Sequence, residues 1–130
     1  MRLVLAATTA VILIGATQSS QPTRTPEAQA KFDKYLGGRV PVETRKCVKA
    51  EILTNPIAID DNTLLFRDGP RVWRSDLRAT LQCGRIGKQS FIHTESAAGR
   101  ICSGEQLEFE DAGFTGACVL GDFVRYDKAK

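Results

Sequence analysis

Short runs of β-branched and other apolar residues, separated by turn-forming residues, follow residue 38, and some of them alternate with polar residues. Residues 106–110 show this alternation most clearly, because Leu107 and Phe109 would lie on one side of an extended chain and Glu108 and Glu110 on the other. Such alternation is typical of a sheet with one buried face. This segment is therefore predicted to be a strand of an antiparallel sheet.

Turn-forming residues divide the rest of this region into further predicted strands. The expected strands lie around 47–48 and at 56–60, 63–67, 71–75, 90–95, 100–102 and 118–126, with 77–83 either a strand or an irregular link and 111–116 a glycine-rich turn. About six to eight short strands joined by tight turns predict a mainly β fold, a small antiparallel barrel or sandwich.

One helix is predicted before the strands, at residues 26–36. Thr25 is a suitable N-cap, Pro26 suits the first helical position, and Gly37-Gly38 would end the helix. An apolar stripe at helical spacing consists of Ala28, Phe32, Tyr35 and Leu36. The helix is a candidate to cover an exposed strand edge.

The first residues predict export. Met1 and Arg2 precede a run without charge, Leu3 to Gly15, which is short for a helix that must cross about 30 Å of hydrocarbon. Small and polar residues follow, as after a secretory signal peptide. We expect a signal peptide at 1–16, a flexible lead at 17–25, one domain at 26–126 and a tail at 127–130, without a stable membrane anchor. An uncleaved anchoring helix is the alternative.

The cysteine content agrees with export. Four cysteines, at 47, 83, 102 and 118, form an even set in a short chain, which favours two disulfides over a zinc site. No C-x-x-C pair is present, and His93 is the only histidine. Of the three possible pairings we favour Cys47–Cys83 with Cys102–Cys118, because sequential pairing closes each loop locally. The compartment is then periplasmic or extracellular.

Four segments also carry a resemblance. They are Asp60–Gly69 (DDNTLLFRDG), Val72–Leu77 (VWRSDL), Ile101–Glu105 (ICSGE) and Cys118–Tyr126 (CVLGDFVRY). Over about residues 37–126 the chain resembles a family of small exported proteins of Gram-negative bacteria with four cysteines and no assigned activity. It departs from that family at Glu105, where Asp is usual, and at Arg125, where Pro is usual. The resemblance implies a fold and a compartment rather than a reaction.

The candidate catalytic and metal-binding groups are weak. His93 with Glu95 could form a general base, but no G-x-S-x-G turn is present and the cysteines are expected to be oxidised. Asp60, Asp61 and Asn62 could bind Ca²⁺, yet they fit a turn better. The acidic set Glu105, Glu108, Glu110, Asp111 and Asp122 is interpreted as a solvated strand face. We therefore predict no enzyme activity, no cofactor and no metal.

Basic residues crowd one predicted hairpin, at Arg67, Arg71, Arg74 and Arg78. The formal net charge is only +3, so nucleic acid is not an expected partner. Trp and Arg are enriched at protein interfaces, and the possible binding face is Trp73 with Arg71 and Arg74. The favoured hypothesis is a non-catalytic protein-binding or envelope-associated module. The alternative is an inhibitor of an extracytoplasmic hydrolase, acting through residues 111–116, and a small hydrolase using His93 is the least favoured.

Overall fold

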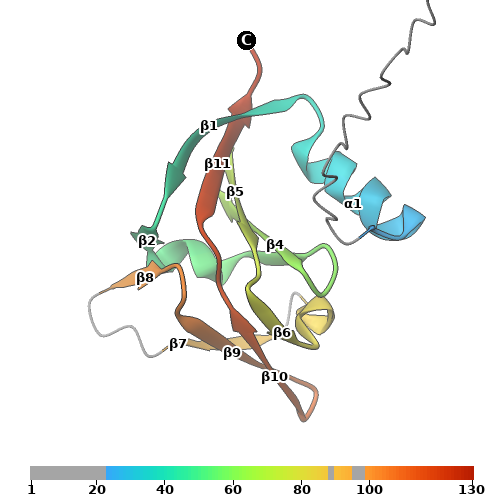
Figure 1. The fold of residues 1–130 in the computed structure, drawn as a ribbon, viewed down its shortest axis with the longest axis vertical. Helices are drawn as coiled ribbons and strands as arrows, with labels where there is room; N and C mark the ends of the chain where they lie inside the picture. The colour runs from blue at the N-terminus through green and yellow to red at the C-terminus, as the bar shows by residue number, and fades with distance from the viewer. Residues whose placement is uncertain (1–22, 88–89, 95–98) are drawn as a thin grey trace, which may run out of the picture.

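A computed structural model describes residues 23–87, 90–94 and 99–130. These residues form one α-helix, two short 3₁₀ helices and eleven strands, which confirms the predicted mainly β fold (Figure 1). The elements are α1 (Pro26–Leu36), β1 (Arg39–Arg45), β2 (Cys47–Lys49), η1 (Ala50–Thr54), β3 (Pro56–Ala58), β4 (Thr63–Asp68), β5 (Arg71–Asp76), β6 (Ala79–Leu81), η2 (Cys83–Arg85), β7 (Phe91–Thr94), β8 (Arg100–Cys102), β9 (Gln106–Asp111), β10 (Phe114–Val119) and β11 (Phe123–Lys128). The predicted signal peptide lies outside the described residues.

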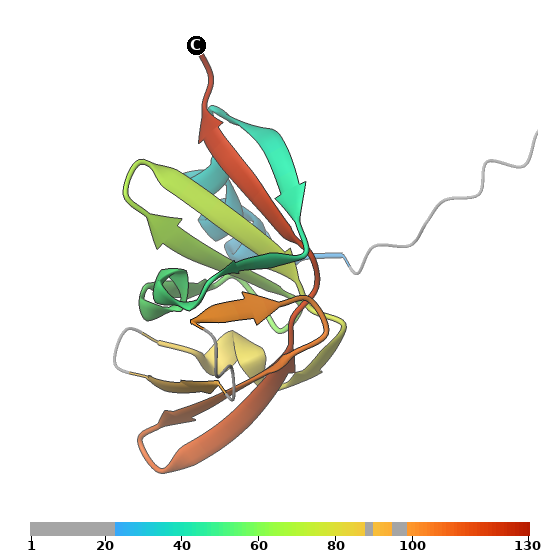
Figure 2. The same cartoon turned by 90° about the vertical axis from the view of Figure 1, so that its left-hand side faces the viewer.

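The strands form three antiparallel groups. A five-stranded sheet has the order β1-β11-β5-β4-β3, a four-stranded sheet has the order β6-β10-β9-β7, and β2 pairs with β8 as a separate ribbon. The ribbon and η1 lie between the two sheets (Figure 2). Neither sheet closes on itself, so the barrel alternative is not realised and the fold is two open sheets over a shared core.

The strand count exceeds the six to eight expected, for two reasons. Strand β1 precedes the first expected strand, around 47–48, and β6 lies within 77–83, which was expected to be a strand or an irregular link. The strand expected at 118–126 is also two strands, β10 and β11, which belong to different sheets. Between them, Ser75 Oγ donates to the Gly121 carbonyl at 3.1 Å and accepts from the Gly121 N–H at 3.0 Å. A Cβ on Gly121 would lie 2.0 Å from the Asp76 carbonyl oxygen, so only glycine fits this crossing.

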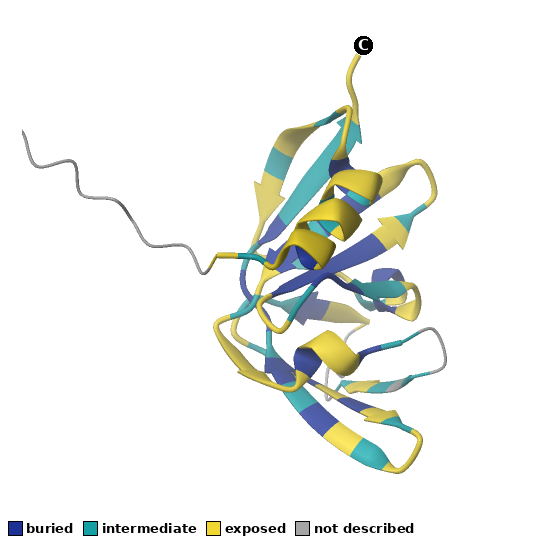
Figure 3. Cartoon of the chain, turned by 90° about the vertical axis from the view of Figure 1, so that its right-hand side faces the viewer, coloured by how far each residue is buried: buried dark blue, intermediate teal, exposed yellow. Residues whose placement is uncertain are grey.

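The helix forms at the predicted residues, but it covers a sheet face rather than an edge. The Thr25 side chain accepts a hydrogen bond from the Ala28 N–H at 3.2 Å. Ala28 and Leu36 pack with Leu65 and Val72 on the outer face of the five-stranded sheet (Figure 3). Arg24, in the predicted lead, already pairs with Asp60 at 3.5 Å. At the other end β11 runs to Lys128, inside the predicted tail.

The main core lies between the two sheets. Leu64, Phe66, Trp73 and Phe123 enter it from the five-stranded sheet, and Leu107, Phe109, Cys83 and Cys118 enter it from the four-stranded side. The rings of Phe66 and Phe123 lie 6.5 Å apart. Because β4 has the helix on one face and this core on the other, Leu64, Leu65 and Phe66 are all fully buried. No helix of the described residues is long and apolar enough to cross a membrane.

All four cysteines form disulfides, but the favoured pairing was wrong. The bonds are Cys47–Cys102 and Cys83–Cys118. Cys47 lies directly opposite Cys102 in the β2–β8 ribbon, with their Cα atoms 4.0 Å apart. Cys118, on β10, lies 5.9 Å from Cys83, Cα to Cα. Strand pairing, which a preference for local loops ignores, places Cys47 opposite Cys102, and the pairing of β6 with β10 brings η2, which holds Cys83, close to Cys118.

One edge of the five-stranded sheet is β1, which among the described strands pairs with β11 alone. Its register shifts between Pro41 and Glu43, which marks a bulge. Val40 and Val42 are each 45% exposed on this strand. The edge is therefore irregular and exposes two apolar side chains.

Candidate binding site

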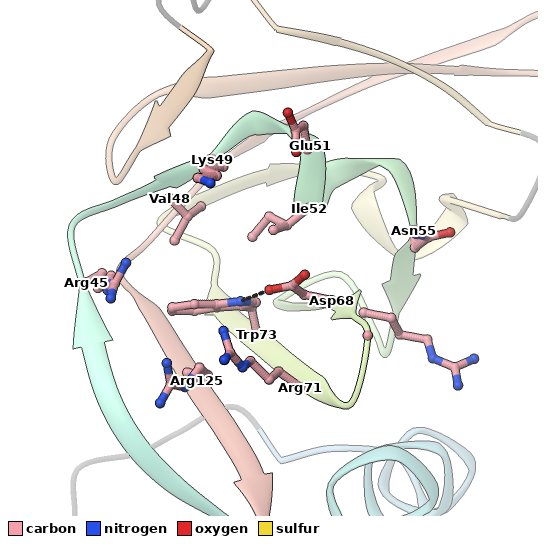
Figure 4. A pocket seen from close by; sticks show the side chains of 12 residues that line it. Arg45, Val48, Lys49, Glu51, Ile52, Asn55, Asp68, Arg71, Trp73 and Arg125 are labelled. Carbon is pink, nitrogen blue, oxygen red and sulfur yellow. Dashed lines mark hydrogen bonds between the residues drawn. The ribbon is translucent and has the colours of Figure 1, made fainter.

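One hollow of the five-stranded sheet lies at Trp73, and we call it the Trp73 hollow. It has a volume of about 520 Å³. In Figure 4, Arg45, Arg71 and Arg125 surround the indole, and Val48 and Ile52 approach it from the opposite side. The complete lining is Arg45, Val48, Lys49, Glu51, Ile52, Asn55, Arg67, Asp68, Gly69, Arg71, Trp73 and Arg125.

Register explains why these side chains meet. Trp73 lies opposite Phe66 of β4 and Arg125 of β11, and residues opposite one another in a sheet share a face. The indole is 4% exposed, so it forms a buried floor. Its Nε1 donates to Asp68 Oδ2 at 3.4 Å, and the Arg45 guanidinium lies 5.8 Å from the ring centroid. The aromatic ring and its polar edge are thus both held in place.

The hollow is electropositive. Five basic side chains line it against two acidic ones, Glu51 and Asp68. Two further carboxylates pair with these cations. Glu43 is shared by Arg45 at 3.0 Å and Arg125 at 3.0 Å, and Asp127 pairs with Arg125 at 3.3 Å. Within the described residues, Lys49, Arg67 and Arg71 form no ion pair. Guanidinium groups bind carboxylates and phosphates through paired hydrogen bonds, so an anionic group is the ligand that this surface suits.

The predicted binding face is only partly assembled. Arg71 and Trp73 line the same hollow, but Arg74 points to the opposite face, because neighbouring residues of a strand alternate. There it bonds both oxygens of Asp76, at 2.9 and 3.0 Å. Burial alone would lower the pKa of Arg74, but its bonds to Asp76 and Tyr126 outweigh burial and raise that pKa. Arg74 therefore has a structural role on the helix-covered face of the sheet and does not line the Trp73 hollow.

Sequence reasoning missed Arg45, Lys49 and Arg125. Each comes from a strand distant in sequence from Trp73. Arg125 was noted only as a departure from the resembled family. Its position opposite Trp73 depends on the β5–β11 register, which no local pattern gives.

The other candidate groups lie elsewhere. His93 is exposed on β7, opposite Glu108 of β9, and Glu95 lies outside the described residues. Asp60 Oδ1 accepts from the Asn62 N–H at 2.8 Å and Asp61 Oδ1 from the Gly84 N–H at 2.8 Å, so this segment is a turn. Over the described ranges, no group of three or more His, Cys, Asp or Glu is placed to hold a metal ion.

The predicted acidic set is dispersed. Glu108 and Glu110 are exposed on β9, whereas Glu105 accepts a hydrogen bond from the Cys102 N–H. Asp122 pairs with Lys46 at 2.6 Å and Arg78 at 3.7 Å. The hydrogen bond from Lys46 holds the pKa of Asp122 below its ordinary value of 3.8. These acids do not form one site.

Comparison with known proteins adds no assignment: no family model, no curated protein and no solved structure matches this chain. The resemblance to the family of small exported proteins therefore stays a prediction.

Proposed function

We propose that this chain is an exported, non-catalytic binding module, periplasmic in a Gram-negative cell, whose Trp73 hollow receives a carboxylate-bearing segment of an envelope protein. The observation that carries the proposal is the gathering of five basic side chains over one buried indole. Both disulfides suit an oxidising compartment outside the cytoplasm. The proposed periplasmic location rests on the predicted signal peptide and on the resemblance to the family of small exported proteins.

A carboxylate fits this hollow better than a sugar ring or a nucleobase. Rings of those kinds bind by stacking on an open aromatic face, and an indole that is 4% exposed offers none. The guanidinium groups of Arg45 and Arg71 are accessible instead, since both residues are exposed at the rim. Recognition by charge-assisted hydrogen bonds is therefore the mode that the site supports.

The single tryptophan of the chain makes a direct test possible. We would titrate the protein with a glutamate-rich peptide and follow Trp73 fluorescence. Arg71→Ala is expected to weaken binding about tenfold, which equals about 1.4 kcal/mol. Arg85→Ala is the matched control, because Arg85 is an exposed arginine beside Phe114 of the four-stranded sheet, and it should leave the affinity unchanged. Absence of any peptide binding, or equal losses in both variants, would overturn the proposal.

A second candidate, inhibition of an extracytoplasmic hydrolase, is favoured by the β9–β10 hairpin. Its turn is held at Ala112 and Gly113, with φ values of 50° and 82°. The rings of Phe114 and Phe109 pack with their centroids 6.3 Å apart, a contact that stabilises the hairpin. Most of the loop expected at 111–116 is however strand, since β10 begins at Phe114. Residual activities of a panel of proteases and lysozymes, with and without the protein, test this candidate.

A further inference from the structure

A second basic hollow lies on the helix side of the five-stranded sheet, and we call it the Arg39 hollow. It has a volume of about 650 Å³, and its charged lining consists of Lys34, Arg39, Arg67 and Lys128. No acidic residue of the described chain lines it. An anion in this hollow would thus meet four cations and no carboxylate.

The two hollows meet at the β4–β5 hairpin. Arg67 lines both of them. By register Arg67 lies opposite Val72, on the helix face, whereas the next residue, Asp68, lies opposite Arg71, on the face of Trp73. The Arg39 guanidinium donates to the Pro70 carbonyl at the hairpin tip, at 2.7 Å. Basic side chains therefore lie on both faces of the β4–β5 hairpin near its tip.

Charge is strongly concentrated here. The two hollows together contain eight of the 18 Lys and Arg residues of the chain but only two of its 15 Asp and Glu residues. The remainder of the chain is thus net acidic, although the whole molecule is +3. A local field of this kind attracts anionic partners that the net charge alone would not suggest.

We infer that the two hollows form one binding groove, which holds an extended acidic peptide segment that bends around the β4–β5 hairpin. This inference rests on the proposed function, and it extends the site from a single carboxylate to a row of them. A small anion would fill one hollow only. A nucleic acid duplex is too stiff, with a persistence length of about 500 Å, to bend around two strands about 4.8 Å apart. A peptide has two free rotations per residue and follows such a path.

Peptide length is the first variable of the test. Glutamate-rich peptides of about four and about twelve residues span about 14 and about 40 Å when extended. At equal salt, the longer peptide should bind at least about tenfold more tightly, because its second contact is intramolecular. An acidic polysaccharide of matched charge should bind more weakly than the long peptide, and equal binding would overturn the peptide assignment.

Variants separate the two hollows. The double change Lys34→Ala and Lys128→Ala removes two cations that make no side-chain hydrogen bond within the described structure. It should weaken the long peptide about tenfold and leave the short one unchanged, whereas Arg71→Ala weakens both. Arg78→Ala with Arg85→Ala removes the same charge outside both hollows and should change neither affinity. If the Lys34 and Lys128 changes leave the long peptide unaffected while the short peptide still binds, the groove is refuted and the proposed function stands. If neither peptide binds, the proposed function itself fails.

Discussion

The two sheets of this molecule differ in how they are covered and in the charge that they present. The five-stranded sheet has the helix on one face and the shared core on the other, and both of its hollows are basic. The four-stranded sheet leaves one face to solvent, where the hollows near His93 are lined by Glu105, Glu108 and Glu110 and, in the described chain, by no Lys or Arg. Although the net charge is modest, the molecule therefore has one basic region and one acidic region.

The difference in covering is visible along single strands. In β4, Thr63 to Phe66 are buried without interruption, because both faces are covered. In β9, Leu107 and Phe109 are buried while Glu108 and Glu110 are exposed. In this protein a continuous apolar run thus marks a strand whose sheet is covered on both faces, and an alternating run marks a strand whose sheet is covered on one face.

The largest expected effect on stability comes from removing the Cys83–Cys118 disulfide, which lies on the side of the four-stranded sheet. Replacing Cys83 and Cys118 by alanine should lower the free energy of unfolding by about 4 kcal/mol from chain entropy alone, and by more because both residues are fully buried in the core. Replacing Cys47 and Cys102 removes slightly more chain entropy, because the sequence separation is 55 rather than 35. It should still cost less in total, since these two residues are only half-buried and leave a smaller cavity.

Urea unfolding measures both variants, with Trp73 fluorescence reporting the five-stranded sheet and far-ultraviolet circular dichroism reporting all strands. One shared core predicts coincident transitions for the two probes. Separate transitions would show that the sheets are independent, and a larger loss for the Cys47–Cys102 pair would reverse the ranking.

A smaller effect is expected where the chain crosses from one sheet to the other. Gly121→Ala places a methyl group 2.0 Å from the Asp76 carbonyl oxygen, and overpacking of this kind costs about 3 kcal/mol. Gly113→Ala is the control, because a Cβ there meets nothing within 4 Å and only its φ of 82° is unfavourable, a cost of about 1 kcal/mol. Equal thermal midpoints for the two variants would contradict the steric account of the crossing.

The smallest effect concerns Asp122, a half-buried acid that pairs with Lys46 and Arg78 where the two sheets meet. Its pKa is lowered in the folded protein, so its stabilisation is fully present above the ordinary value of 3.8 and is lost as pH falls through the lowered pKa. Asp122→Asn should therefore be slightly less stable than the parent at neutral pH and equal to it in stronger acid. Urea midpoints across that pH range measure this, and a difference that grows with acidity would contradict it.

The sequence predicted what local patterns control. Thr25, Pro26 and Gly37 set the helix boundaries, and the alternation around Phe109 identified β9. The sequence did not predict the features that depend on which strands are neighbours in a sheet. The pairing of Cys47 with Cys102 and the position of Arg125 opposite Trp73 both follow from register. Trp73 and Arg74 are neighbours in sequence, but the alternation of a strand turns their side chains to opposite faces.

The bulged edge strand β1 has a consequence for how the protein behaves at high concentration. A regular apolar edge is a template onto which another chain can add a strand, and growth from such edges leads to fibrils. Here Pro41 supplies no N–H group, and the register shift before Glu43 interrupts the repeat that an incoming strand would need to match. Val40 and Val42 can thus remain exposed while self-association through this edge is discouraged.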